Sequence, residues 1–185
     1  MSIFEFLMVL LSIIIGLSIA EILTGFADSL SSKREQKFPW LHTLFSLGLF
    51  IGSLQVWWES WELRLLDQWA FTDLVLMVSI PVLIFIISRI LNPGREYSGN
   101  LDDYYLKNAS KIYLLLGIAV IIGNSFRSIL YGAQLFIVDN LTAVPLLIIA
   151  IILGLSKNKT IHKILLAIII SLILLDVLLI NLIIS

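Results

Sequence analysis

The chain has 185 residues, of which 59% are hydrophobic and 14% charged, and its mean hydropathy is +1.04. Soluble domains carry about 25% charged residues, and a chain of this length cannot hide so large an apolar surplus in one core. The composition therefore excludes a soluble globular protein and predicts an integral membrane protein folded as one domain over residues 1–185. A net charge of −1 provides no basic field for nucleic acid, and the absence of cysteine excludes disulfides and thiol chemistry.

Six apolar stretches predict an all-α integral membrane bundle of six transmembrane helices. They cover residues 3–26, 40–61, 71–91, 112–134, 141–155 and 164–184. A helix of about 20 residues crosses the roughly 30 Å hydrocarbon layer of a bilayer. The fifth stretch, with about 15 residues, is short enough to be re-entrant instead of crossing fully. Residues 101–111, which follow the turn signals of the third loop, are expected to form a short surface helix.

The basic residues predict which loops face the cytoplasm. Ten of the twelve lie in or beside the first, third and fifth loops: Lys33, Arg34, Lys37, Arg89, Arg95, Lys107, Lys111, Lys157, Lys159 and Lys163. Since Lys and Arg accumulate on the cytoplasmic side, loops 27–39, 92–111 and 156–163 are expected inside and both termini outside. The tryptophans around the second loop indicate an aromatic belt at the other membrane surface: Trp57, Trp58, Trp61 and Trp69.

Two ionisable residues inside the expected spans are candidates for function, because charged groups are costly within a bilayer. Arg127 lies in the fourth span and Asp176 in the sixth. Both spans start at the cytoplasmic side, so the two side chains fall at similar depth and we predict that they pair, with Asn124 as a polar neighbour. The functional interpretation is a gate or a proton-linked switch. The alternative is a structural ion pair that holds two helices together.

Glu21 and Arg89 form a second candidate ion pair, since each lies near the cytoplasmic end of its span. Each could equally reach the membrane surface by itself. Gln55 adds a polar group to the second span. The predicted polar pathway is therefore made of Arg127, Asp176, Asn124, Glu21 and Gln55. The sequence offers no cluster of metal ligands and no nucleophile beside a base, so we expect no catalytic residue, metal or cofactor.

Small residues mark two further helix faces. In the first span they recur at every fourth position: Ser12, Gly16, Ala20 and Thr24. In the second span Gly48 and Gly52 form a Gly-xxx-Gly motif. Such stripes let helix backbones approach closely in lipid. They favour contact between helices of one chain, with a homo-oligomer interface as the alternative.

The first third of the chain carries a family resemblance. The segments that carry it are Phe4-Glu5-Phe6, Gly16-Leu17, Glu21, Leu23-Thr24-Gly25, Trp40-Leu41-His42 and Gln55-Val56-Trp57-Trp58. Together they resemble the start of a family of small bacterial multi-pass membrane proteins to which no activity is assigned. The resemblance implies a bacterial inner membrane and a recurrent architecture, and it transfers no function.

These features predict a small channel or transporter for an ion or small solute, embedded in the lipid bilayer. The alternative is a non-transporting membrane subunit, such as a scaffold, a sensor or a defence-type partner, in which the intramembrane charges are structural. Its docking surface for a membrane or cytoplasmic protein would be the basic loop 92–111. A homo-oligomer fits either function. A lipid-active membrane enzyme is the least favoured alternative, because no constellation of catalytic groups is evident.

Overall fold

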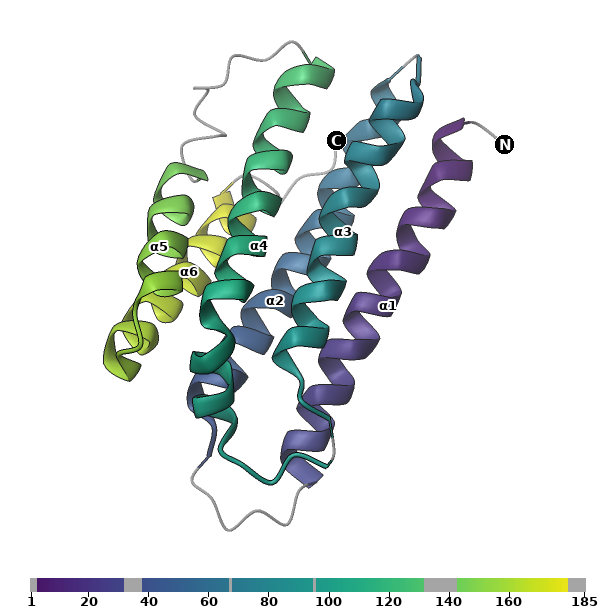
Figure 1. Cartoon of the computed structure of the whole chain (residues 1–185). Helices are drawn as coiled ribbons and strands as arrows, with labels where there is room; N and C mark the ends of the chain where they lie inside the picture. The colour runs from purple at the N-terminus through teal and green to yellow at the C-terminus, as the bar shows by residue number, and fades with distance from the viewer. Residues whose placement is uncertain (1–2, 32–37, 67, 95, 132–142, 180–185) are drawn as a thin grey trace.

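A computed structural model describes residues 3–31, 38–66, 68–94, 96–131 and 143–179, without the side chains of residues 30–31, 126–131 and 175–179. Every regular element in these ranges is helical, so the all-α prediction is confirmed. The elements are α1 (Ile3–Ser31), α2 (Trp40–Glu59), the short 3₁₀-helix η1 (Ser60–Leu65), α3 (Phe71–Leu91), α4 (Leu101–Tyr131), α5 (Ala143–Leu155) and α6 (Lys159–Leu179). Figure 1 shows these helices as one bundle.

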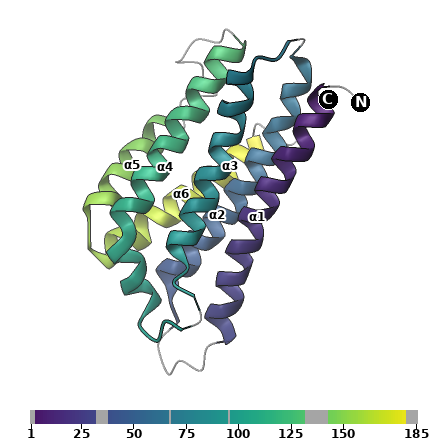
Figure 2. The same ribbon diagram turned by 45° about the vertical axis from the view of Figure 1, so that its right-hand side comes forward.

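The helices pack in two layers. α1, α3, α4 and α5 lie side by side in that order, and α2 and α6 pack against one face of this row (Figure 1). The turned view of Figure 2 shows the same arrangement, with α6 crossing behind α4. Consecutive helices run in opposite directions. The ends of α1, α3 and α5 therefore lie at the same end of the bundle as the beginnings of α2, α4 and α6.

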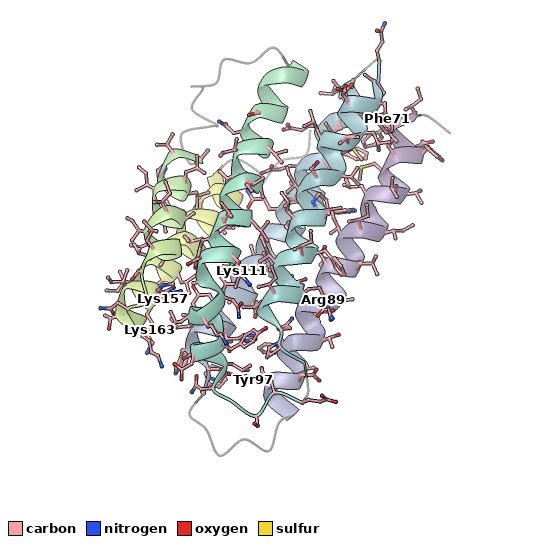
Figure 3. The ribbon with its side chains drawn as sticks, in the orientation of Figure 1. Phe71, Arg89, Tyr97, Lys111, Lys157 and Lys163 are labelled. Carbon is pink, nitrogen blue, oxygen red and sulfur yellow. The ribbon has the colours of Figure 1, made fainter. Side chains whose placement is uncertain are left out.

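This alternation brings most of the described Lys and Arg residues to one end of the bundle. One end, called here the basic end, carries Arg89, Lys107, Lys111, Lys157, Lys159 and Lys163; Figure 3 labels several of them in its lower half. The opposite end, called the tryptophan end, carries Trp57, Trp58, Trp61 and Trp69 together with Arg64. Phe71, at the start of α3, marks the tryptophan end in Figure 3.

Four helical segments in the described part of the chain are long and apolar enough to cross a membrane. They are Ile3–Ser29, Trp40–Leu65, Phe71–Leu91 and Leu101–Ser125, whereas Ala143–Leu155 is a shorter apolar helix. The separate surface helix expected over residues 101–111 is wrong, because these residues form the first turns of α4. Leu101, Tyr105 and Ala109 recur every four residues and are buried, so packing against the bundle continues the helix to Leu101.

The small-residue stripe of the first helix lies on a different face from the one expected. α1 packs on α3 and α2 through a stripe of buried residues at Leu7, Leu11, Ile15, Ser18, Ile22 and Gly25. Ser12, Gly16, Ala20 and Thr24 are exposed instead, and no atom lies within 4 Å of a Cβ built on Gly16. The larger aliphatic side chains take the packed face, so no close approach of backbones occurs at Gly16, although Ser12 accepts a within-chain hydrogen bond from Trp57 Nε1 of α2 at 3.2 Å.

A serine side chain joins α1 to α3 in the bundle interior. The Ser18 hydroxyl donates to the backbone oxygen of Pro81 at 3.1 Å, and both residues are fully buried. Pro81 lies inside α3 and has no N–H to give to the helix. The missing N–H frees the carbonyl of Met77, one turn earlier in α3, whereas Ser18 donates to the carbonyl of Pro81 itself, so this bond is an additional contact that joins α1 to α3.

Candidate functional site

A central cavity of about 280 Å³ lies between five helices, α2 to α6. Its lining is aliphatic and aromatic for most of its length, with Phe45, Ile84, Leu116, Ala119 and Ile169 among the lining residues. Three glycines, Gly48, Gly52 and Gly123, also line it. Glycines leave space where other residues would place side chains, so the Gly-xxx-Gly motif of α2 hollows the bundle here.

The two polar side chains that line this cavity lie toward its tryptophan end. Gln55 and Glu59 follow each other by one turn at the end of α2, and the Gln55 amide donates to the Glu59 carboxylate at 3.0 Å. Both are partly exposed. The cavity therefore has an apolar body and one polar end.

A second, smaller pocket of about 130 Å³ lies at the basic end, lined by α1, α2, α3, the residues that follow α3 and the start of α4. Glu21 and Arg89 meet at its edge, with Arg89 Nη1 2.9 Å from Glu21 Oε1. The Arg89 side chain is 63% exposed and the Glu21 side chain 17%. This is the pair considered from the sequence, and its role in function stays a prediction. Arg89 lies beside α1 in Figure 3.

Asn92 closes the same pocket from the end of α3. Its side-chain amide donates to the backbone oxygen of Glu21 at 3.1 Å. The same side chain occupies the space where a Cβ on Gly25 would lie. Gly25 therefore lets the end of α3 approach α1 closely, which holds Arg89 within reach of Glu21.

An acidic side chain from α4 caps α2. Asp102 Oδ1 accepts hydrogen bonds from the backbone nitrogens of Leu41, at 2.9 Å, and His42, at 3.1 Å. The first N–H groups of a helix have no partner within it and attract negative charge. Pro39, at the N-cap position, makes no side-chain cap. The capping group is therefore supplied by another helix.

A buried chain of hydrogen bonds joins α4 to α6 at the basic end. Tyr105 Oη lies 2.6 Å from Tyr113 Oη and 2.8 Å from His162 Nδ1, and His162 Nε2 lies 3.0 Å from the backbone oxygen of Ser156. A carbonyl oxygen can only accept, so Nε2 carries the hydrogen in neutral His162 and Nδ1 accepts from Tyr105. Tyr105 then accepts from Tyr113. All three side chains are at most 2% exposed.

Burial favours the neutral form of His162. The residue precedes the apolar part of α6, and burial lowers its pKa below the ordinary 6.5; the positive charge of Lys157 lowers it further, and the hydrogen bond to Ser156 opposes both. The neutral form is also the one that can accept from Tyr105. Charge and hydrogen bonding therefore favour the same protonation state.

The remaining polar residues predicted for the pathway are divided between separate places. Arg127 lies in α4 and Asp176 in α6, but their side chains lie outside the described part of the structure, so their pairing stays a prediction. Asn124 follows Gly123 of the central cavity, and its side-chain oxygen is buried. Gln55 lines the central cavity, whereas Glu21 lines the pocket at the basic end.

Sequence reasoning missed three features of the site. The Asp102 cap, the chain of Tyr105, Tyr113 and His162, and the central cavity all depend on which helices are neighbours. The spacing of the tyrosines, eight residues apart and so on one face of a helix, was the signal for the second feature. Among the described residues, no group of three or more His, Asp or Glu side chains is placed to hold a metal ion.

The comparisons with known proteins add no identity. No family model, no curated protein and no solved structure matches the chain.

Proposed function

We propose that the chain is an integral membrane protein of six membrane-crossing helices, with both termini on the outer face of a bacterial inner membrane. The uneven distribution of Lys and Arg between the two ends supports this topology. Six described Lys and Arg residues lie at the basic end, which is the cytoplasmic end by the preference of basic residues for that side. The exposed Trp57, Trp58 and Trp61 at the other end suit the outer membrane surface.

In this membrane the protein transports a small solute. The observation that carries the proposal is the central cavity, a partly open space lined by residues of helices α2 to α6. Ligand sites in helical membrane proteins are commonly formed between helices near the middle of the bilayer. The cavity contains Gln55 of the predicted pathway, and Asn124 is next to its glycine, Gly123.

The chemistry of the lining favours a small organic solute over a bare ion. Placing an uncompensated charge in an apolar environment costs many kcal/mol, and Gln55 and Glu59 lie together at one end of an otherwise apolar wall. A solute with a hydrocarbon surface can contact the apolar wall without placing a charge there, so it avoids that cost.

Flux through purified protein in liposomes tests the proposal. Proton movement is followed with an enclosed pH-sensitive dye, and uptake of radiolabelled organic solutes by filtration. Wild type is compared with Asp176→Asn and Arg127→Ala, and we expect flux that both substitutions change. A protein that is folded by circular dichroism yet gives no flux above protein-free liposomes, for protons and for every solute tested, would contradict transport.

A non-transporting membrane subunit is the second candidate. The observation in its favour is that the polar groups of the basic end bond to one another, as Glu21 does to Arg89 and Asp103 to Lys159. Lys107 and Lys111, both exposed on α4, would then form part of a docking surface. Reversing both charges should abolish capture of a partner by the tagged protein while leaving solute flux unchanged.

A further inference from the structure

We infer that the central cavity is a binding site for the hydrocarbon chain of a membrane amphiphile. The inference rests on the proposed membrane location of the chain and names the chemical class of its ligand; it does not require that the ligand be moved across. An apolar cavity of about 150 Å³ stays free of water and binds a molecule the size of benzene. The cavity here measures about 280 Å³ and, unlike that closed cavity, is partly open at its boundary, so it has room for a longer apolar group.

The glycines give the cavity its shape. No atom lies within 4 Å of a Cβ built on Gly52, so α2 faces open space at that turn. Gly48 and Gly123 are in closer contact, since a Cβ placed on them would lie 3.5 Å from Ile170 and 3.3 Å from Ile80, respectively. A space open at Gly52 and closed by isoleucines at its sides fits an unbranched chain better than a bulky ring system.

The position of the polar side chains sets the direction of the bound amphiphile. The lining runs along α2 from Leu44 to Glu59, a rise of about 22 Å at 1.5 Å per residue. Gln55 and Glu59 lie at the tryptophan end of this path, where a head group would meet the membrane surface. The chain then extends toward Leu44 and Phe45, in the apolar interior of the bundle. The ligand therefore enters from the outer leaflet.

Photochemical labelling with the full chain in liposomes tests the site. The probes are a fatty acid carrying a diazirine in its chain and a phosphatidylcholine carrying the same group in one acyl chain, and labelled residues are identified by mass spectrometry. We expect label on cavity residues such as Ile84, Ala119 and Val120, and we expect an excess of unlabelled fatty acid to compete for it. If the fatty acid probe labels the cavity and unlabelled fatty acid reduces this label, the ligand is a free fatty acid. If the phosphatidylcholine probe labels the cavity, the ligand is a membrane lipid.

Gly52→Leu and Gly16→Leu are matched variants for this experiment. Both place the same side chain at a helical glycine with no atom within 4 Å of its Cβ, but Gly52 lines the cavity and Gly16 lies on the exposed face of α1. We expect Gly52→Leu to lower cavity labelling by about tenfold, the effect of a loss of about 1.4 kcal/mol in binding free energy, because its side chain takes up space that the bound chain would occupy, and Gly16→Leu to leave it unchanged.

Two results would overturn the inference. One is label restricted to exposed residues such as Leu17 and Leu114, and the other is cavity label that no competitor reduces. Both are read on the wild-type protein, so the test does not depend on whether Gly52→Leu folds. Flux is not measured, so a failed transport assay and a failed labelling experiment contradict different proposals.

Discussion

Asp102 Oδ1 lies 2.9 Å from the backbone nitrogen of Leu41, so a carboxylate on α4 caps the first turn of α2. Two helices that are separated by α3 in the sequence are joined by this contact. A side-chain cap is worth about 0.5–2 kcal/mol, and here it also fixes the start of a helix that lines both pockets.

Replacing Asp102 tests the cap. We expect Asp102→Ala to lower the free energy of unfolding by about 1 kcal/mol, because two backbone N–H groups lose their acceptor. Asp103→Ala is the matched control, since Asp103 pairs with Lys159 at the surface, where both side chains are more than half exposed, and such pairs contribute little. Thermal unfolding in mild detergent measures both variants. If both variants lose the same free energy of unfolding, the cap by Asp102 does not stabilise the protein.

Gly25 carries a second testable contact. A Cβ at this position would overlap the Asn92 side chain, so Gly25→Ala must displace Asn92 and break its hydrogen bond to the backbone oxygen of Glu21. We expect a loss of about 1–3 kcal/mol in the free energy of unfolding. Gly16→Ala, where the Cβ meets no atom, is expected to be neutral or stabilising. If Asn92→Ala, which removes the clashing group, does not reduce the cost of Gly25→Ala, the contact is not its cause.

The ion pair between Glu21 and Arg89 should contribute little to stability. Because the Arg89 side chain is 63% exposed, solvent screens the attraction and a double-mutant cycle should give a coupling energy of about 0.2–1 kcal/mol. The cycle uses Glu21→Gln, Arg89→Ala and the double variant. The Glu21 backbone oxygen still accepts from Asn92 in every variant, so the cycle isolates the charge interaction. If the coupling energy stays the same at high salt, the two charges are not screened by solvent as proposed.

The buried histidine should make stability depend on pH. The pKa of His162 is lowered in the folded protein from an ordinary value of 6.5, so between the two values the unfolded chain binds more protons than the folded one. The free energy of unfolding then rises with pH through this window. Stability is complete above about pH 6.5 and falls as the pH decreases toward the lowered value. Protonation would also make Nδ1 a donor and reverse its bond with Tyr105.

The groups that face His162 define the control for this pH effect. They are Tyr105 and Tyr113 from α4 and Lys157 from the turn before α6, and the tyrosines stay neutral throughout the range. The midpoint of thermal unfolding is measured from pH 5 to 8 in wild type and in His162→Gln. The decrease toward pH 5 should be smaller in His162→Gln. An identical pH profile would show that another group is responsible.

The sequence predicts well where the helices lie along the chain, but it does not predict which helices contact one another. Apolar length places α3 over the same residues, 71–91, because a membrane span needs a fixed number of apolar residues. The same criterion starts the fourth helix at 112, eleven residues late, because residues such as Asp102 and Lys107 are too polar for a span and are expected in a separate surface helix. What extends α4 is packing of Tyr105 and Ala109 against other helices, and a pattern along one helix does not contain that information.

The polar groups also divide into those that the sequence could pair and those that depend on which helices are neighbours. Glu21 and Arg89 could be matched from the sequence because both lie near the same end of expected spans. Asp102 could not be assigned as a cap, since its acceptor role depends on α2 beginning beside α4. The cavity depends on the packing of five helices around Gly48 and Gly52, and a Gly-xxx-Gly motif alone describes a close contact as readily as a hollow.

The topology can be tested because the chain has no cysteine, so a single introduced cysteine is the one thiol in the protein. Thr72 is exposed at the tryptophan end and Thr160 at the basic end. In intact bacterial cells, a membrane-impermeant maleimide should label Thr72→Cys after it has crossed the outer membrane. It should label Thr160→Cys after the inner membrane is opened, because loops rich in Lys and Arg stay in the cytoplasm. The reverse pattern would place the termini inside, and labelling of both positions in intact cells would argue against a membrane-crossing bundle.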